Sequence, residues 1–189
     1  YYTRFVISCC FTIIEMINEK VEFRKLISRI ANKEKSALEE FYNLYGRLIQ
    51  SAALATTRDA FMADEVVNDI LLKIWQQAPD IKGIKRPRSW IYTITANHAK
   101  NLIKRTKEYV DIFDTDIPVN FKATDEILEE SAFIYRLRNL NEKEKQIMIF
   151  RFVEDMTFKE IAYEVKEPLG NITVTYYRAL EKIRKNLIE

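Results

Sequence analysis

Few residue types in this sequence could support catalysis or metal binding. His98 is the single histidine, and the adjacent Cys9 and Cys10 are the only cysteines. One imidazole excludes the paired and triple histidines of common zinc sites, and adjacent cysteines suit neither a disulfide framework nor a C-x-x-C metal site. The three glycines are too far apart for the phosphate-binding motifs G-x-G-x-x-G and G-x-x-x-x-G-K. The sequence therefore predicts no catalytic residue, no metal site and no cofactor, which argues against an enzyme.

Carboxylates and an amide gather between residues 63 and 75 (ADEVVNDILLKIW). The apolar residues of this segment recur at i, i+3, i+4, i+7, i+8, i+11 and i+12, which predicts an amphipathic helix. The opposite face carries Asp64, Glu65, Asn68 and Asp69. Acid-base catalysis needs burial to shift a carboxyl pKa, and this face points away from the apolar stripe. We interpret it as a docking surface, with plain solvated surface as the alternative.

A basic strip runs from Lys82 to Lys107 and contains no acidic residue. Basic side chains interleaved with aromatic ones suit phosphate binding and stacking on unpaired bases. We expect Trp90 to pack in the core, Tyr92 to be the stacking residue, and His98 to lie on the inner stripe of a helix capped by Ser89. The candidate nucleic-acid contacts are Lys85, Arg86, Arg88, Tyr92, Asn97, Lys100, Asn101, Lys104 and Arg105.

The charge reverses over residues 108–130, where acidic residues dominate around a single Lys122 and Pro118 interrupts the chain. No helical period is sustained there, so we interpret the segment as an acidic linker. It either serves as a solvated connector or shields the basic strip when DNA is absent.

The last sixty residues contain two helix-start signals and a helix-turn-helix pattern. Asn141 with Glu144, and Thr157 with Glu160, have the capping-box spacing. A short helix from Thr157, a break near Lys166 and a long apolar stripe from residue 169 to 187 follow. The residues expected to contact DNA from this last helix are Asn171, Thr173, Val174, Thr175, Tyr177, Arg178 and Lys182.

These elements point to an all-α protein of two helical domains. Only three glycines and four prolines occur among 189 residues, and the chain is long enough to bury a core. We expect domains at 19–107 and 131–189, with 108–130 as the linker. The apolar run at 5–14 falls short of the roughly 20 residues of a membrane helix. We expect residues 1–18 to be an N-terminal extension outside both domains, in which residues 1–15 carry no function and Met16 is the first residue of the functional protein. We also expect no membrane insertion.

Three segments in series resemble the extracytoplasmic-function (ECF) class of RNA polymerase sigma factors, in the sigma-70 family. Residues 63–75 resemble the family helix A-E-D-L-V-Q-E-V-F-L-x-L-W. Residues 90–105 (WIYTITANHAKNLIKR) are similar to W-L-x-x-I-A-x-N-x-x-x-D-x-x-R. Residues 158–180 (FKEIAYEVKEPLGNITVTYYRAL) are similar, without gaps, to Y-x-E-I-A-x-x-L-x-x-P-x-G-T-V-x-x-R-x-x-R-A. The resemblance as a whole covers the chain from about Met16 to the end.

The resemblance implies a non-enzymatic, two-domain subunit of bacterial RNA polymerase. In it, the acidic helix docks on the polymerase clamp helices, while the basic strip and the loop before it meet the minus-ten element and the melted non-template strand. The C-terminal domain meets the minus-thirty-five element and the polymerase flap. It also implies a cytoplasmic protein that is a monomer when free, and it leaves open whether an anti-sigma factor is a further partner. The alternative is a stand-alone helix-turn-helix regulator.

Several positions depart from the family pattern. Asn68 and Asp69 replace a Gln-Glu pair and are each one methylene shorter, and Asn101 stands where Asp is usual. Lys104 replaces a common Arg, which exchanges a bidentate fork for a point charge. Few cations lie on the recognition helix, so we expect the C-terminal domain alone to bind DNA feebly.

Overall fold

The computed structural model describes residues 19–113, 133–134 and 136–185, with only the backbone for 107–113. Within these ranges the regular structure is helical and no strand occurs, which confirms the all-α prediction. A first helix covers residues 19–31. The other elements are α2 (Lys35–Thr57), α3 (Ala60–Gln77), η1 (Ala78–Asp80), α4 (Pro87–Phe113), η2 (Leu137–Asn139), α6 (Glu142–Phe152), α7 (Phe158–Val165) and α8 (Leu169–Lys185).

Helix boundaries follow the local signals in the sequence. The side chain of Asp59 caps α3 by accepting a 2.8 Å hydrogen bond from the backbone N–H of Met62. Both predicted capping boxes, Asn141 with Glu144 and Thr157 with Glu160, are present. Ser89 does not cap α4 as expected, because Pro87 already begins that helix.

Helix ends in this glycine-poor chain use charged residues in the left-handed conformation. Lys33, Arg58 and Lys166, which follow the first helix, α2 and α7, have φ values of 64°, 61° and 61°. A left-handed residue other than glycine costs roughly 1 to 2 kcal/mol. The surrounding packing must therefore hold these turns, including the turn of the predicted helix-turn-helix at Lys166.

The N-terminal helices share one apolar core. Phe41 and Ile49 of α2, Ile70 of α3 and Ile91 of α4 are fully buried. Phe23 of the first helix meets the Trp90 ring edge-on at 5.9 Å, so Trp90 packs against the core as predicted. Fully burying each such side chain contributes about 1.5 to 3 kcal/mol. The core fixes which faces of α3 and α4 remain available for partners.

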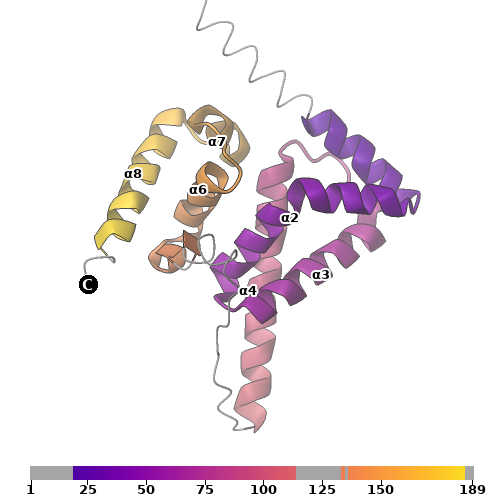
Figure 1. Cartoon of the computed structure of the whole chain (residues 1–189), viewed down its shortest axis with the longest axis horizontal. Coiled ribbons are helices and arrows are strands. Elements are labelled where there is room, and N and C mark those ends of the chain that lie inside the picture. Colours follow the sequence, from indigo (N-terminus) through magenta and orange to yellow (C-terminus); the bar gives the residue numbers. More distant parts are fainter. Residues whose placement is uncertain (1–18, 114–132, 135, 186–189) are drawn as a thin grey trace, which may run out of the picture.

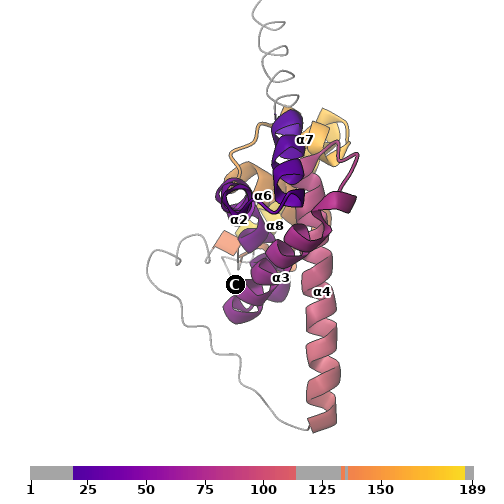
Figure 2. The same cartoon turned by 90° about the vertical axis from the view of Figure 1, so that its right-hand side faces the viewer.

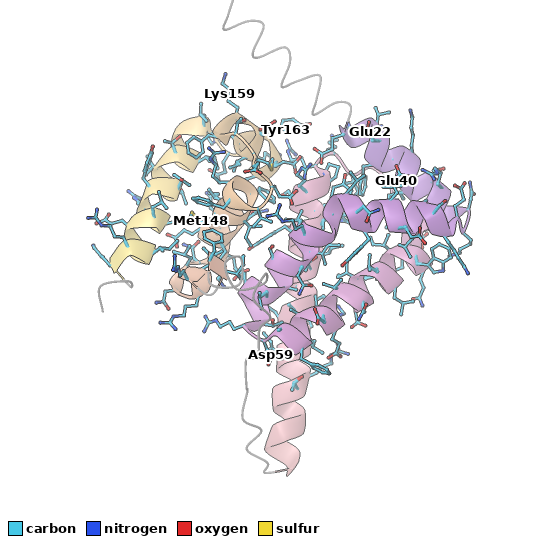
Figure 3. All side chains as sticks on the ribbon, viewed as in Figure 1. Glu22, Glu40, Asp59, Met148, Lys159 and Tyr163 are labelled. Atoms are coloured by element: carbon cyan, nitrogen blue, oxygen red, sulfur yellow. The ribbon has the colours of Figure 1, made fainter. Side chains whose placement is uncertain are left out.

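The C-terminal helices α6, α7 and α8 form the predicted helix-turn-helix unit. Met148, Ile172 and Ile183 are buried between them, and Figure 3 labels Met148 on α6. The Phe158 ring of α7 contacts the Tyr176 ring of α8 edge-on at 4.9 Å. Tyr176 therefore belongs to the inner stripe of α8, which leaves the opposite side of α8 toward solvent.

The two halves of the chain pack against each other. In Figures 1 and 2, α6 and α7 lie beside α2 and the upper part of α4, and the lower part of α4 projects beyond the other helices. We call this the closed arrangement. Because α4 continues to Phe113, the first residues of the predicted linker are helical. The rest of the linker, and residues 1–18, lie outside the described residues. No helix of the described part is long and apolar enough to cross a membrane.

Candidate protein and nucleic-acid interfaces

The polar face of α3 is open to solvent. Asp64, Glu65 and Asn68 are exposed, while Val66 and Ile70 on the other side of the helix are buried. Figure 3 marks the start of this helix at Asp59. The predicted amphipathic pattern is confirmed, and we call Asp64, Glu65, Asn68 and Asp69 the docking face.

Two members of the docking face are held by neighbouring helices. The Gln50 amide of α2 donates to the Asp64 carboxylate at 3.0 Å. His98 of α4 lies with Nε2 2.7 Å from the Asp69 carboxylate. His98 lies seven residues after Ile91 and four before Leu102, both buried, and faces α3 as expected of the inner stripe; its side chain is 21% exposed and its polar partner is Asp69. Glu65 makes no side-chain polar contact within the described part of the chain.

Two exposed apolar residues border the docking face. Phe61 is 82% exposed and Leu72 is 52% exposed. With Glu65 and Asn68 they follow i, i+4, i+7 and i+11, so all four lie on one side of α3. The sequence analysis did not single out Phe61 or Leu72, although their helical register relative to Glu65 could have identified them. They add apolar area to an otherwise acidic surface.

The arginines near the start of the basic strip contact residues of both halves of the chain. The Arg88 guanidinium pairs with Glu154 and, at 2.9 Å, with Glu19 of the first helix. Arg86 donates to the backbone carbonyl of Tyr163, and its guanidinium lies over the Tyr163 ring at 5.0 Å. Figure 3 labels Tyr163 on α7. In the closed arrangement these two cations are therefore engaged by protein groups rather than open to phosphates.

Tyr92 was predicted to be available for stacking on bases, but its side chain does not project into solvent. It is 4% exposed, its ring meets Phe150 of α6 edge-on at 6.0 Å, and its hydroxyl donates to the Glu142 carbonyl at 3.3 Å. Burial raises the pKa of Tyr92. The expectation of an exposed stacking residue is wrong for the closed arrangement because α6 covers this side of α4.

The remaining part of the strip is more accessible. Lys100 is half-exposed and pairs with Glu142 at 3.2 Å. The other residues predicted here that lie on the surface are Lys85, Asn97, Asn101, Lys104 and Arg105. The predicted nucleic-acid residues thus divide into a covered group next to α6 and α7 and an exposed group farther along the strip.

Buried carboxyl groups surround Arg88 where the halves meet. Glu19, Glu154 and Glu164 line a cleft of about 360 Å³ together with Arg88 and Tyr45. The Glu164 carboxylate accepts a 2.9 Å hydrogen bond from the backbone N–H of Ser89 in the first turn of α4. Burial raises the pKa of Glu164 to about 7 and also raises the pKa values of Glu19 and Glu154, although Arg88 opposes the shift. We therefore expect the closed arrangement to depend on the ionisation of these groups.

The outward side of α8 has a mixed character. Val174 is 49% exposed and Tyr177 is 60% exposed. Arg178 is also exposed and makes no side-chain polar contact among the described residues. The Asn171 amide donates to Glu167 at 3.1 Å, whereas the Lys182 ammonium donates to Glu144 of α6 at 2.6 Å. Lys182 is therefore committed to a contact within the protein.

Thr173 and Thr175, the other two residues of α8 predicted to contact DNA, are less available to a partner. The Thr173 hydroxyl donates to the Leu169 carbonyl one turn earlier at 2.9 Å, and Thr175 is half-buried. Leu169, which was expected to begin the apolar stripe of this helix, is instead 43% exposed, because it lies in the first turn of α8. The outward face therefore combines apolar side chains with Arg178 rather than presenting a row of cations.

The arrangement of an acidic α3, a basic α4 and a separate helix-turn-helix is that of a transcription initiation subunit. Residues 41–109 match the family model of Sigma-70 region 2, and residues 136–185 match that of Sigma-70 region 4. The chain belongs to the sigma-70 family of RNA polymerase sigma factors, in the ECF class. It acts in transcription initiation, binds DNA through its helix-turn-helix, and as a sigma factor is not a catalyst.

Relatives of known identity extend over most of the chain. The RNA polymerase sigma-H factor of Pseudomonas aeruginosa is 24% identical over 181 residues, which cover 87% of this chain and 93% of that protein. The ECF RNA polymerase sigma factor RpoE of Cereibacter sphaeroides is 23% identical over 164 residues, or 82% of this chain and 89% of that protein. The match is therefore not confined to one of the two regions.

Solved structures share the fold. CnrH, solved in complex with the cytosolic domain of CnrY, has a TM-score of 0.58 and 17% identity, covering 87% of this chain and 96% of that one. The sigma factor RpoE of Bartonella quintana, solved with the anti-sigma factor NepR, has a TM-score of 0.51 and 17% identity, covering 79% and 96%. At these identities the likeness shows a common helical fold.

Proposed function

We propose that this sigma factor docks on core RNA polymerase through the docking face of α3. The proposal is supported by a face whose carboxylates are exposed, whose apolar border remains uncovered, and whose opposite side is fixed in the core. Charge complementarity with a basic partner would favour association, and Phe61 and Leu72 would add apolar contact. The partner surface is the clamp helices of the polymerase, and the compartment is the cytoplasm, where the polymerase works.

We further propose that the basic strip binds the minus-ten element and the melted non-template strand. Arg88, Lys100 and the backbone N–H of Ser89 now contact Glu154, Glu142 and Glu164. Carboxylates and phosphates compete for the same donors. The C-terminal helices must therefore leave α4 before DNA can contact Arg88 or stack on Tyr92, and polymerase binding would supply the separation.

The outward face of α8 is proposed to read the minus-thirty-five element. Val174 would contact a thymine methyl group, Asn171 an adenine edge, and Arg178 a guanine or a phosphate. Because Lys182 is paired with Glu144, few cations remain to hold DNA. We therefore expect this domain to contribute mainly when contact with the polymerase flap holds it beside the promoter.

The domain limits 19–107 and 131–189 and the linker 108–130 form part of the proposal. Limited proteolysis of the free protein should cut first between residues 108 and 130. First cleavage within α2 or α6 would contradict these limits.

Anti-sigma regulation is the last part of the proposal. CnrH was solved in complex with the cytosolic domain of CnrY and the sigma factor RpoE with the anti-sigma factor NepR, and we extend to this chain a partner of the NepR kind. Such a partner would hold the chain in the closed arrangement, in which Arg88 and Tyr92 are covered by the C-terminal half. An anti-sigma factor that bound equally well to a chain with separated halves would contradict this role.

Reconstitution with core polymerase tests the proposal as a whole. The holoenzyme should support run-off transcription, and sequencing the DNA that it binds should reveal two promoter elements. A stand-alone regulator would instead bind a specific duplex without polymerase and give no run-off product. Specific binding without transcription would therefore overturn the proposal.

A further inference from the structure

The contact between His98 and Asp69 joins the two functional helices of the N-terminal half. His98 Nε2 lies 2.7 Å from Asp69 Oδ2, and the side chains are 21% and 39% exposed. An ionised carboxylate can only accept, so the Nε2 nitrogen carries the hydrogen. Asp69 is on α3 and His98 is 29 residues away on α4. The contact therefore depends on how α3 packs against α4.

We infer that His98 is a positioning residue for polymerase docking, which rests on the docking role proposed for α3. His98 engages one oxygen of Asp69 and leaves Oδ1 as the oxygen available to a basic group of the polymerase. Without this contact Asp69 would sample several rotamers, and a partner would have to order it on binding. His98 thus acts through Asp69 and does not itself touch the polymerase.

The immediate surroundings favour this role over two others. A core role does not fit, because the His98 side chain is partly exposed and its polar partner is a surface carboxylate. A direct DNA contact does not fit either, because Nε2 is directed at α3, whereas the adjacent Asn97 is exposed on α4. The remaining consequence of the contact is to restrain Asp69 within the docking face.

The pairing has a second consequence because it spans α3 and α4. Glu65 and Asn68, the nearest members of the docking face, make no side-chain polar contact with other described residues, whereas Asp69 is tied to the helix that carries the basic strip. A polymerase group that binds Asp69 is therefore connected to α4 through the hydrogen bond between Asp69 and His98. Asp69 should tolerate substitution less well than Glu65 for this reason.

A double-mutant cycle with core polymerase tests the inference. Full-length protein, His98→Ala, Asp69→Ala and the double variant would be compared by equilibrium binding to core polymerase, with thermal melting measured in parallel. We expect His98→Ala to weaken binding about threefold to tenfold, the net range of one ordinary hydrogen bond between partly exposed groups. In the Asp69→Ala background, where His98 has no side-chain acceptor at position 69, the same change should have little further effect.

Two additional variants separate positioning from a general loss of stability. His98→Gln keeps a side-chain N–H donor and should recover part of the lost affinity. Thr106→Ala removes another side-chain hydrogen bond of α4, to the Leu102 carbonyl at 3.0 Å, and should leave polymerase affinity unchanged. Affinity losses that simply follow the melting temperature across all variants would overturn the inference.

The outcomes also distinguish this inference from the docking proposal. If charge reversal at Glu65 weakens binding but His98→Ala does not, the positioning role is wrong and docking stands. If His98→Ala weakens binding equally in the presence and absence of the Asp69 carboxylate, the effect does not pass through Asp69, and the inference is again overturned. If charge reversal at Glu65 also has no effect, the docking proposal itself fails.

Discussion

The acidic face of α3 and the basic strip of α4 differ in their availability. Both were predicted from sequence as charged surfaces, yet Glu65 is exposed on α3 while Arg88 of α4 is enclosed by Glu19 and Glu154. The charges that the C-terminal half places near each helix explain why Arg88 is covered and Glu65 is not. The closed arrangement brings carboxylates of α6, α7 and the turn between them to α4, whereas the described residues place no basic group of that half against Glu65. If the proposed assignments hold, we expect the free protein to present its polymerase surface while its DNA surface is still covered.

Charge reversal on α3 tests whether its exposed acidic face binds the polymerase, and we expect it to have the largest effect. Glu65→Lys with Asp69→Lys should lower polymerase affinity about 100-fold, because two attractive contacts become repulsive on a surface that is already exposed. The melting temperature should change little, since both side chains lie off the buried stripe. Binding would be measured by titration of labelled sigma factor with core polymerase.

The matched control reverses charge at exposed carboxylates outside α3. Glu39→Lys on α2 with Asp80→Lys in η1 changes the net charge equally. If this pair weakened binding as much as the α3 pair, total charge rather than the docking face would control the association.

Removing the main partner of Arg88 should uncover the DNA surface. Glu154→Ala leaves Arg88 with Glu19 alone in a partly buried position, and loss of one member of such a pair disfavours the closed arrangement. We expect about a tenfold rise in the affinity of the free protein for single-stranded minus-ten DNA. The separation of α2 and α8, followed by paired spin labels, should increase in the same variant.

Glu181→Ala serves as the control for Glu154→Ala because its partner, Lys185, lies on the same helix at 3.1 Å. It should change neither the label separation nor the DNA affinity. Tighter DNA binding without separation of the labels would show that Glu154 acts only through general electrostatics.

The closed arrangement should weaken as the pH rises from 5 to 8. Burial raises the pKa of Glu164 from 4.5 to about 7, against the effect of Arg88, Arg86 and the Ser89 N–H. The closed state therefore binds a proton more tightly than the open state. The stabilisation of the closed state by the Glu164 proton is complete below about pH 4.5. It is lost as the pH rises through about 7.

Spin-label separation across this pH range measures the effect. Ionisation of Glu164 alone can change the ratio of closed to open protein by at most about tenfold for each pH unit within the window. Glu164→Gln, which keeps the shape and cannot ionise, should flatten the dependence. The raised pKa values of Glu19 and Glu154 act in the same direction, so a smaller slope should remain. A closed population that grew with rising pH would contradict the assignment.

The contrast between α3 and α4 also shows which features the sequence could predict: those that depend on neighbouring residues, and not those that depend on packing between distant segments. The α3 face, both capping boxes and the turn at Lys166 depend on residues within a few positions of each other, and local periodicity and capping predicted them. Burial of Tyr92 depends on Phe150, which approaches only when α6 packs on α4. The His98 partner, Asp69, is equally nonlocal. A single sequence carries no local signal for such pairings.

The smallest expected effect concerns Arg178, on a third surface that is neither acidic nor covered. Arg178→Ala in the holoenzyme should weaken promoter binding about fivefold if the guanidinium holds a phosphate, with equal loss on every variant of the upstream element and a shallower salt dependence. If Arg178 instead pairs with a guanine, the loss should concentrate on promoters that carry it, because one such contact gives about 1 to 3 kcal/mol of discrimination. Lys182→Ala is the comparison, since Lys182 is already bound to Glu144 and should contribute less to DNA binding. No loss with Arg178→Ala on any promoter would mean that this side of α8 does not face DNA, and the open surface of the C-terminal half would then need another partner.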